Sequence, residues 1–184
     1  MAAHYVLAAI AAALSVVVSA AHADPFTLTS KTFTDGEAMP NKVSDNRSGG
    51  ACHGENVSPQ LSWTNPPAGA KTFVLAIVDP QGRNGLGVYH FVGYGIPASV
   101  TSFAEAELSS PSDKYVGGTN TPGLTHYSGP CPPPGPPHHY SFVLIATDLE
   151  RDELPPELTL PAVLARLEGH AKGSTGMVGL FGGQ

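Results

Sequence analysis

Apolar residues in this chain are gathered into short runs, separated by long polar stretches that are rich in glycine and proline. Beyond the N-terminal region, the most hydrophobic run is 73–78, Phe-Val-Leu-Ala-Ile-Val. The runs at 88–92 and 140–146 are rich in β-branched and aromatic residues. Short apolar runs of this kind, bounded by turn residues, predict buried strands. We therefore expect three strands in the core.

Weaker patterns add further elements. Alternation at the start of 26–34 predicts a half-buried strand, and short strands are expected from residue 61 and over 177–181. Residues 97–126 are expected to be mostly loop. One helix is indicated by Leu160, Val163, Leu164 and Leu167, which recur at helical spacing after a possible N-cap, Thr159. The pattern predicts a mainly β protein with few helices.

The first 23 residues form a separate segment. An almost unbroken apolar run ends in a small-x-small sequence at 21–23, which is typical of a signal peptide and its cleavage site. The alternative is an uncleaved membrane anchor, although the run is short for one. We predict a signal peptide at 1–23 and a single domain at 24–184. The mature chain would be periplasmic or secreted, without stable insertion in a membrane.

Charge and composition exclude one class of partner. The formal net charge is −6 and only 13% of the residues are charged. Because no basic stripe is available to neutralise phosphates, we expect no binding to nucleic acid. Two cysteines in an exported protein predict one disulfide, between Cys52 and Cys131. The alternative is a pair of free buried thiols.

A proline-rich stretch at 130–137 precedes the run at 140–146. Proline fixes φ and lacks an N–H, so this stretch forms neither helix nor central strand. One interpretation is a flexible linker. We favour a stiff loop that holds His138 and Tyr140 at the mouth of a strand, as the wall of a binding site.

Two further polar residues lie on the central runs, Asp79 directly after 73–78 and His90 within 88–92. A buried carboxylate needs a partner, and a glycine-rich hairpin between the two runs lets Asp79 accept a hydrogen bond from His90. The other imidazole nitrogen would then face a cleft. The alternatives are a core histidine at His90 and a turn cap at Asp79.

These residues belong to a wider resemblance. The chain resembles the phosphatidylethanolamine-binding protein (PEBP) family, and most closely its bacterial Raf kinase inhibitor-like branch. The matching motifs follow the expected order over nearly all of 24–184. They are Gly54-Glu55-Asn56-Val57-Ser58-Pro59, Val74 to Pro80, Tyr89-His90-Phe91-Val92, Tyr94 to Val100, Gly129 to Gly135, His138-His139-Tyr140, Gly169-His170 and Met177-Val178-Gly179.

The resemblance implies a PEBP-like β-sandwich with a large central antiparallel sheet, one or two peripheral helices, and a small anion-binding pocket at one end. It also implies roles for six ligand-binding residues. They are Asp79 (orienting the histidine), His90 (donor to the anion), Gly129 (backbone donor), Pro132 (pocket wall), His138 and Tyr140.

Two departures from the family pattern concern this pocket. The family commonly has Asp-Pro-Asp-x-Pro where this chain has Asp79-Pro80-Gln81-Gly82-Arg83. The usual His-Arg-Tyr is His138-His139-Tyr140 here, which removes a cation behind the pocket. The first departure also removes a second carboxylate and a rigidifying proline.

The resemblance leads us to expect an exported binding protein that captures a phosphoryl head group or another small anion. A partner-protein inhibitor, for example of a secreted protease, is the alternative. An enzyme is less favoured, because no nucleophile elbow and no tight metal-ligand spacing occurs in the sequence. We expect no metal and no cofactor.

Overall fold

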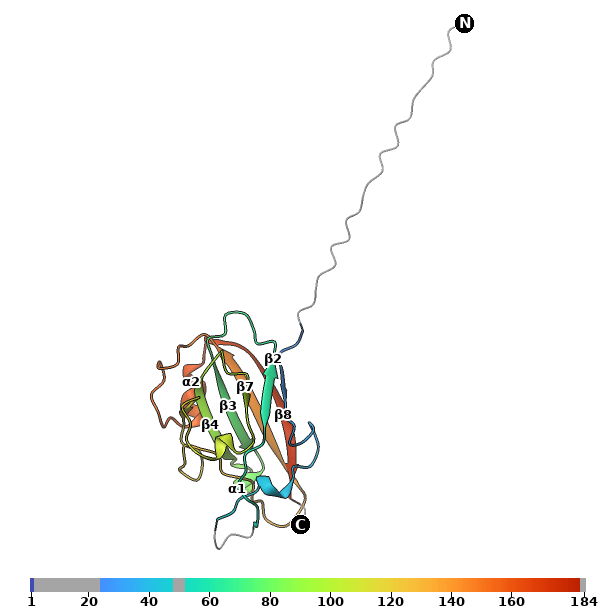
Figure 1. Ribbon diagram of the computed structural model, residues 1–184, viewed down its shortest axis with the longest axis vertical. Coiled ribbons are helices and arrows are strands. Elements are labelled where there is room, and N and C mark those ends of the chain that lie inside the picture. The colour runs from blue at the N-terminus through green and yellow to red at the C-terminus, as the bar shows by residue number, and fades with distance from the viewer. Residues whose placement is uncertain (2–23, 48–51, 183–184) are drawn as a thin grey trace.

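The structure is a computed structural model that describes residue 1, residues 24–47 and residues 52–182. The predicted signal peptide thus falls almost entirely outside the described residues. The described part is mainly β, as expected, and its strands form two antiparallel sheets (Figure 1). Among the described residues, no helix combines the length and the apolar character needed to cross a bilayer.

The larger sheet has five strands and is built around β3 (Thr72–Asp79). In spatial order the strands are β6 (Val116–Gly117), β4 (Val88–Pro97), β3, β7 (His138–Thr147) and β8 (Ala171–Phe181). Phe73, Leu75 and Ile77 face one hydrophobic cluster, while Val74 and Ala76 face another. The central strand is therefore buried on both faces, which explains its continuous apolar run.

A smaller sheet covers one face of the large one. It consists of β1 (Thr27–Thr29), β2 (Leu61–Thr64) and β5 (Ser102–Phe103). Trp63 of β2 is buried and packs edge-on against Phe73, with ring centroids 5.5 Å apart. These aromatic contacts between the sheets make the larger of the two cores.

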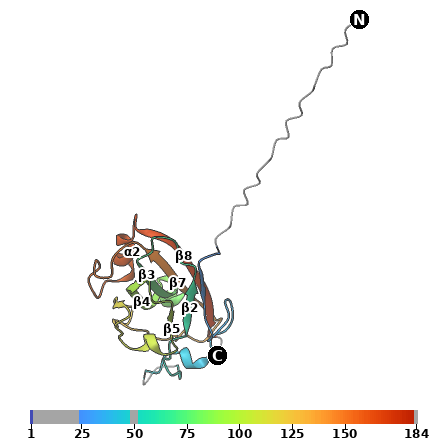
Figure 2. The same cartoon turned by 45° about the horizontal axis from the view of Figure 1, so that its top comes forward.

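Helix α2 (Leu160–Arg166) covers the opposite face of the large sheet, so that the sheet lies between a helix and a second sheet (Figure 2). Leu160, Val163 and Leu167 are buried against this face, whereas Leu164 is exposed. Three of the four residues that predicted the helix thus form its packing face. The helix stabilises the sheet by removing apolar area from water.

The structure differs from the expectations in four places. Strand β1 covers only three residues of the expected 26–34, and the glycine-rich hairpin contains a short helical turn, α1 (Gly82–Gly85). The last strand is longer than expected, because β8 pairs with β7 along its whole length despite its polar start. The loop at 97–126 also contains β5, β6 and the 3₁₀ turn η2 (Glu107–Ser109).

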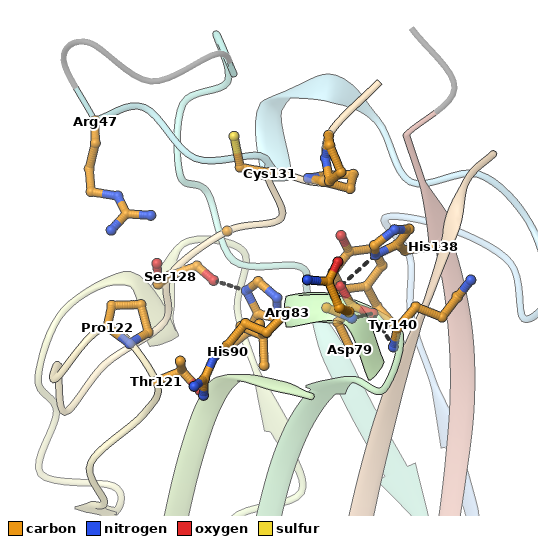
Figure 3. Close-up of a pocket in the computed structure, with 17 residues that line it drawn as sticks. Arg47, Asp79, Arg83, His90, Thr121, Pro122, Ser128, Cys131, His138 and Tyr140 are labelled. Atoms are coloured by element: carbon orange, nitrogen blue, oxygen red, sulfur yellow. Dashed lines mark hydrogen bonds and ion pairs between the residues drawn. The ribbon is translucent and has the colours of Figure 1, made fainter. Parts of the chain in front are cut away.

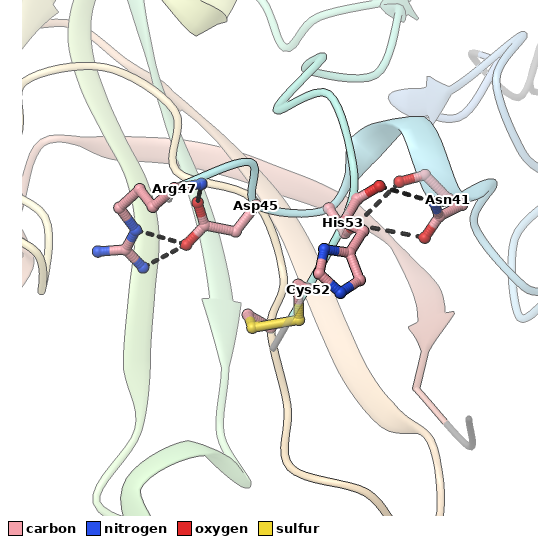
Figure 4. Close-up of a disulfide and its surroundings, with 7 residues drawn as sticks. Asn41, Asp45, Arg47, Cys52 and His53 are labelled. Carbon is pink, nitrogen blue, oxygen red and sulfur yellow. Dashed lines mark hydrogen bonds and ion pairs between the residues drawn. A yellow bond between two sulfur atoms is a disulfide. The ribbon is translucent and has the colours of Figure 1, made fainter. Parts of the chain in front are cut away.

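The predicted disulfide between Cys52 and Cys131 is present (Figure 4). It joins the loop at 41–57, which begins with the 3₁₀ turn η1 (Asn41–Val43), to the proline loop at 128–137. Backbone bonds reinforce this junction, since Asp45 N donates to Pro130 O at 3.0 Å. The proline loop is therefore fastened to the body of the protein and is not a flexible linker.

Removal of the disulfide should destabilise the fold. The cysteines are 79 residues apart, so the bridge constrains a long loop in the unfolded chain. We expect the double variant Cys52→Ser/Cys131→Ser to lose about 4 kcal/mol of unfolding free energy in denaturant titrations, less any strain in the native bridge. An unchanged denaturation midpoint would contradict this expectation.

Candidate ligand-binding site

A cavity of about 520 Å³ lies at one end of the large sheet, where β3 ends and β4 and β7 begin (Figure 3). It brings together all six residues predicted to bind a ligand, and Cys131 as well. The described residues that line it are Arg47, Asp79, Gln81, Gly82, Arg83, Asn84, Val88, His90, Thr121, Pro122, Ser128, Gly129, Cys131, Pro132, Pro133, His138 and Tyr140.

Asp79, the last residue of β3, holds one side of the cavity together. Asp79 as a whole is 3% exposed, and its carboxylate accepts three hydrogen bonds. Oδ1 accepts from the backbone N–H groups of Gln81 and Gly82, at 2.9 and 3.0 Å. Oδ2 accepts from Nδ1 of His138, at 2.7 Å. The buried carboxylate is therefore satisfied within the protein and orders both the α1 turn and the start of β7.

The hydrogen-bond partner predicted for Asp79 was wrong. The sequence interpretation paired Asp79 with His90, whereas the structure pairs it with His138. His138 lies at the first position of β7, the strand that neighbours β3 on the side away from β4. Because the carboxylate accepts from Nδ1, the Nε2 atom of His138 is left for other contacts.

A β-bulge explains why His90 is not the partner. Ile77 pairs with Phe91 and Val78 pairs with Tyr89, so His90 is an extra residue on β4. A bulge redirects the side chains around it. Here the His90 ring contacts Tyr140, with centroids 5.2 Å apart and an edge-on geometry. The irregular register, which the sequence pattern does not reveal, thus places His90 at the base of the cavity.

His90 is held as a neutral imidazole. Its Nδ1 lies 2.7 Å from the backbone oxygen of Ser128, which only accepts, so Nδ1 carries the proton (Figure 3). Burial lowers the pKa of His90, and this effect outweighs the hydrogen bond to Ser128 and the charge of Asp79, which raise it. The charge of Asp79 thus acts in the direction of a cationic ring, but burial of the ring is the larger effect. Nε2 of the neutral ring carries a lone pair.

Gly129 lines the cavity, but its backbone N–H is not a free donor. It donates to Oδ1 of Asn56 at 2.7 Å. A Cβ atom on Gly129 would lie 2.3 Å from the backbone oxygen of Val43. Glycine is thus required here because the proline loop and the 41–57 loop approach closely. Its expected role as a backbone donor to an anion stays a prediction, and it would require the bond to Asn56 to be shared or replaced.

Tyr140 contributes a hydroxyl group without a partner. The residue is 1% exposed, and its hydroxyl makes no hydrogen bond within the described part of the chain. Burial raises the pKa of Tyr140 well above its usual range, so the hydroxyl stays protonated and can donate. An unsatisfied buried hydroxyl costs about 1–3 kcal/mol, which a ligand atom at the right place would offset.

The two arginines were missed by the sequence analysis. Arg83 lies in the α1 turn, and Arg47 lies in the loop at 41–57. Asp45 holds the Arg47 side chain, with Nε and Oδ2 2.5 Å apart (Figure 4). Although burial raises the pKa of Asp45, the hydrogen bonds and charge of Arg47 hold it below its usual range. No sequence signal brings Arg47 to this site, because its place follows from the packing of Asp45 against the proline loop.

The remaining predicted residues lie where they were expected. Pro132 and Cys131 form part of the wall, and Cys52 lies behind it as the partner of Cys131. In residues 24–47 and 52–182, no three histidine, cysteine, aspartate or glutamate side chains gather into a group that could hold a metal ion. The chemistry available to the cavity is hydrogen bonding by imidazole, phenol, amide and guanidinium groups.

The chain is similar in sequence and in fold to several known proteins. A UPF0098 protein of Methanothermobacter thermautotrophicus is 35% identical over 156 residues, which cover 84% of this chain and 97% of that protein. LppC of Mycobacterium tuberculosis is 34% identical over 162 residues, which cover 88% and 74% of the two chains. The crystal structure of Escherichia coli YbcL, described as a PEBP family member, superposes with a TM-score of 0.76 at 29% identity and covers 85% of this chain and 98% of YbcL.

A sequence model of a protein family also matches this chain. It is described as phosphatidylethanolamine-binding protein, and it matches residues 29–182. This span includes every strand of the large sheet and every residue that lines the cavity. The chain belongs to the phosphatidylethanolamine-binding protein family.

Proposed function

We propose that this chain is an exported binding protein whose cavity takes a small anionic group, such as a phosphoryl head group, and that it is not an enzyme. The observation that carries the proposal is the buried Tyr140 hydroxyl, which has no partner within the described residues and lies beside His90. Buried polar groups are normally hydrogen-bonded, so an unpaired donor beside a cavity favours an oxygen-rich ligand.

The histidines would supply the remaining contacts. The Nδ1 atoms of His90 and His138 donate to Ser128 O and Asp79 Oδ2, which leaves their Nε2 atoms for a ligand. An entering anion favours protonation of the imidazole that faces it, which turns the acceptor into a charge-assisted donor. Binding would therefore take up a proton at His90, and Tyr140 would donate a further hydrogen bond.

Export and domain organisation belong to the same proposal. The signal peptide at 1–23 would direct a single domain at 24–184 to the periplasm or the medium. The disulfide between Cys52 and Cys131 supports this, because disulfides persist in oxidising compartments. LppC, a relative provisionally named a lipoprotein, is also consistent with a place in the cell envelope.

The first test is the pH dependence of anion binding. Because burial lowers the pKa of His90 in the free protein and a bound anion would raise it, affinity should increase as the pH falls between the two values. It should level off below the free-state pKa. We would titrate the domain at 24–184 with inorganic phosphate by calorimetry, with sulfate as an anion that does not itself titrate in this range.

His90→Ala provides the variant for this test. It should abolish the pH dependence and weaken binding by about tenfold or more, since it removes a charge-assisted hydrogen bond. His170→Ala is the matched control, because His170 is exposed and does not line the cavity. If the folded wild-type domain binds neither phosphate nor sulfate at millimolar concentration, the proposal fails. A search for protein partners would then be the next step.

A second test concerns the positioning of His138. Asp79→Asn replaces an oxygen that accepts from Nδ1 with an amide nitrogen that cannot accept, so the ring must change its tautomer or its orientation. We expect phosphate affinity to fall about tenfold, as is typical when the partner of a ligand-binding histidine is removed. Asp148→Asn, which breaks an exposed pair with His170, should leave the affinity unchanged. Equal affinities of wild type and Asp79→Asn would count against the role of this pair.

A further inference from the structure

The cavity offers no free carboxylate. Asp79 is the only acidic residue among the described residues that line it. Both of its oxygens are occupied by hydrogen bonds from Gln81, Gly82 and His138. A ligand that carries an ammonium group needs an acceptor for that charge, and a carboxylate is the usual one. This cavity has none to offer beyond the oxygens that Asp79 already uses.

Gln81 stands directly beside this carboxylate and also lacks a free acceptor. Its Oε1 accepts from the backbone N–H of His139 at 2.7 Å and lies 2.9 Å from Nδ1 of the same residue. Because a backbone N–H is always a donor, this contact fixes which end of the amide is the oxygen. The amide nitrogen has no acceptor partner in the part of the chain that the structure describes. The Gln81 side chain therefore offers a ligand no free acceptor and no negative charge.

Arg83 adds a positive charge to the cavity lining from the α1 turn, where two consecutive residues have a positive φ. Arg83 and Asn84 have φ values of 54° and 58°, a region that residues other than glycine seldom adopt. Hydrogen bonds close the turn on both sides, from Gly85 N to Gln81 O and from Gly87 N to Gly82 O. Arg83 has no ion-pair partner among the described residues. The turn thus presents an uncompensated guanidinium to the cavity (Figure 3).

Arg47 lines the cavity from the opposite loop, although Asp45 compensates part of its charge. The cavity lining therefore holds two guanidinium groups and one carboxylate, in a chain whose formal net charge is −6. With Arg47 paired to Asp45, Arg83 is the guanidinium of the lining that has no acidic partner among the described residues. It favours anions over zwitterions, because a ligand ammonium group would be repelled by the guanidinium groups.

From these contacts we infer that the cavity selects phosphoryl ligands without an ammonium group and discriminates against phosphorylethanolamine. Arg83 and Gln81 determine this specificity. Arg83 repels the ammonium group, and Gln81 provides no negative charge to attract it. The inference rests on the proposed function, since it concerns the ligand of the same cavity. It would make the natural ligand an anionic phosphomonoester or an anionic lipid head group.

Two ligands of nearly equal size test this inference directly. Ethyl phosphate and O-phosphorylethanolamine differ only by the terminal ammonium group. Calorimetric titration of the domain at 24–184 should give a dissociation constant at least about fivefold lower for ethyl phosphate, as expected for one like-charge repulsion at a partly hydrated site. Equal affinities, or tighter binding of phosphorylethanolamine, would overturn the inference. Failure of both ligands to bind would instead overturn the proposed function.

Variants assign the discrimination to the named residues. Arg83→Gln should bring the two dissociation constants together. Gln81→Glu keeps an oxygen for His139 and replaces the amide nitrogen with a carboxylate oxygen, so it should shift preference toward phosphorylethanolamine. Lys31→Gln is the control, because it removes an exposed positive charge that does not line the cavity. If Lys31→Gln changes the ratio as much as Arg83→Gln does, general charge and not the cavity sets the preference, and the inference fails.

Vesicles separate the two sources of such a ligand. The domain would be sedimented with phosphatidylcholine vesicles that contain either phosphatidylglycerol or phosphatidylethanolamine. Retention only on the phosphatidylglycerol vesicles, lost in Arg83→Gln, supports an anionic lipid head group. Binding of ethyl phosphate without retention on any vesicle supports a free phosphomonoester. Retention on the phosphatidylethanolamine vesicles alone would overturn the inference.

Discussion

The site depends on the need to satisfy one buried carboxylate. Asp79 ends the central strand at a point where almost no water reaches it, and an unpaired charge there would be expensive. Its three hydrogen bonds come from two elements, the α1 turn and the start of β7. The same bonds that stabilise the charge therefore set the position of Gln81, Gly82 and His138. A requirement of folding thus builds one side of the cavity.

The other side of the cavity depends on how two loops pack together. Gly129 approaches Val43 so closely that no side chain fits, and Asn56 accepts from its backbone N–H. The disulfide fastens the same two loops. This junction places Ser128, whose backbone oxygen fixes the tautomer of His90. The packing of these two loops thereby decides which nitrogen of His90 is left without a partner at the cavity.

The two departures from the family pattern form one contact in the structure. Gln81 stands where the family commonly has a carboxylate, and His139 stands where it usually has an arginine. Gln81 Oε1 accepts from the backbone N–H of His139 and lies 2.9 Å from its ring Nδ1, so the residues at the two positions contact each other directly. This contact holds the α1 turn against β7, although the carboxylate and the arginine common in the family are both replaced. With Arg83 added beside it, the balance of charge in the cavity lining becomes more positive.

The sequence by itself determined the strands of the core, the α2 helix, the disulfide and, through the family motifs, six of the residues that line the cavity. It did so because the apolar runs and the motifs are local, and because only two cysteines are available to pair. It could not determine the hydrogen-bond partners inside the cavity. The bulge at His90 breaks the alternation on which such reasoning depends, and the pairing of Asp79 with His138 joins residues 59 positions apart. Arg47 reaches the site only because loop packing brings it there, so its role is a property of the tertiary structure alone.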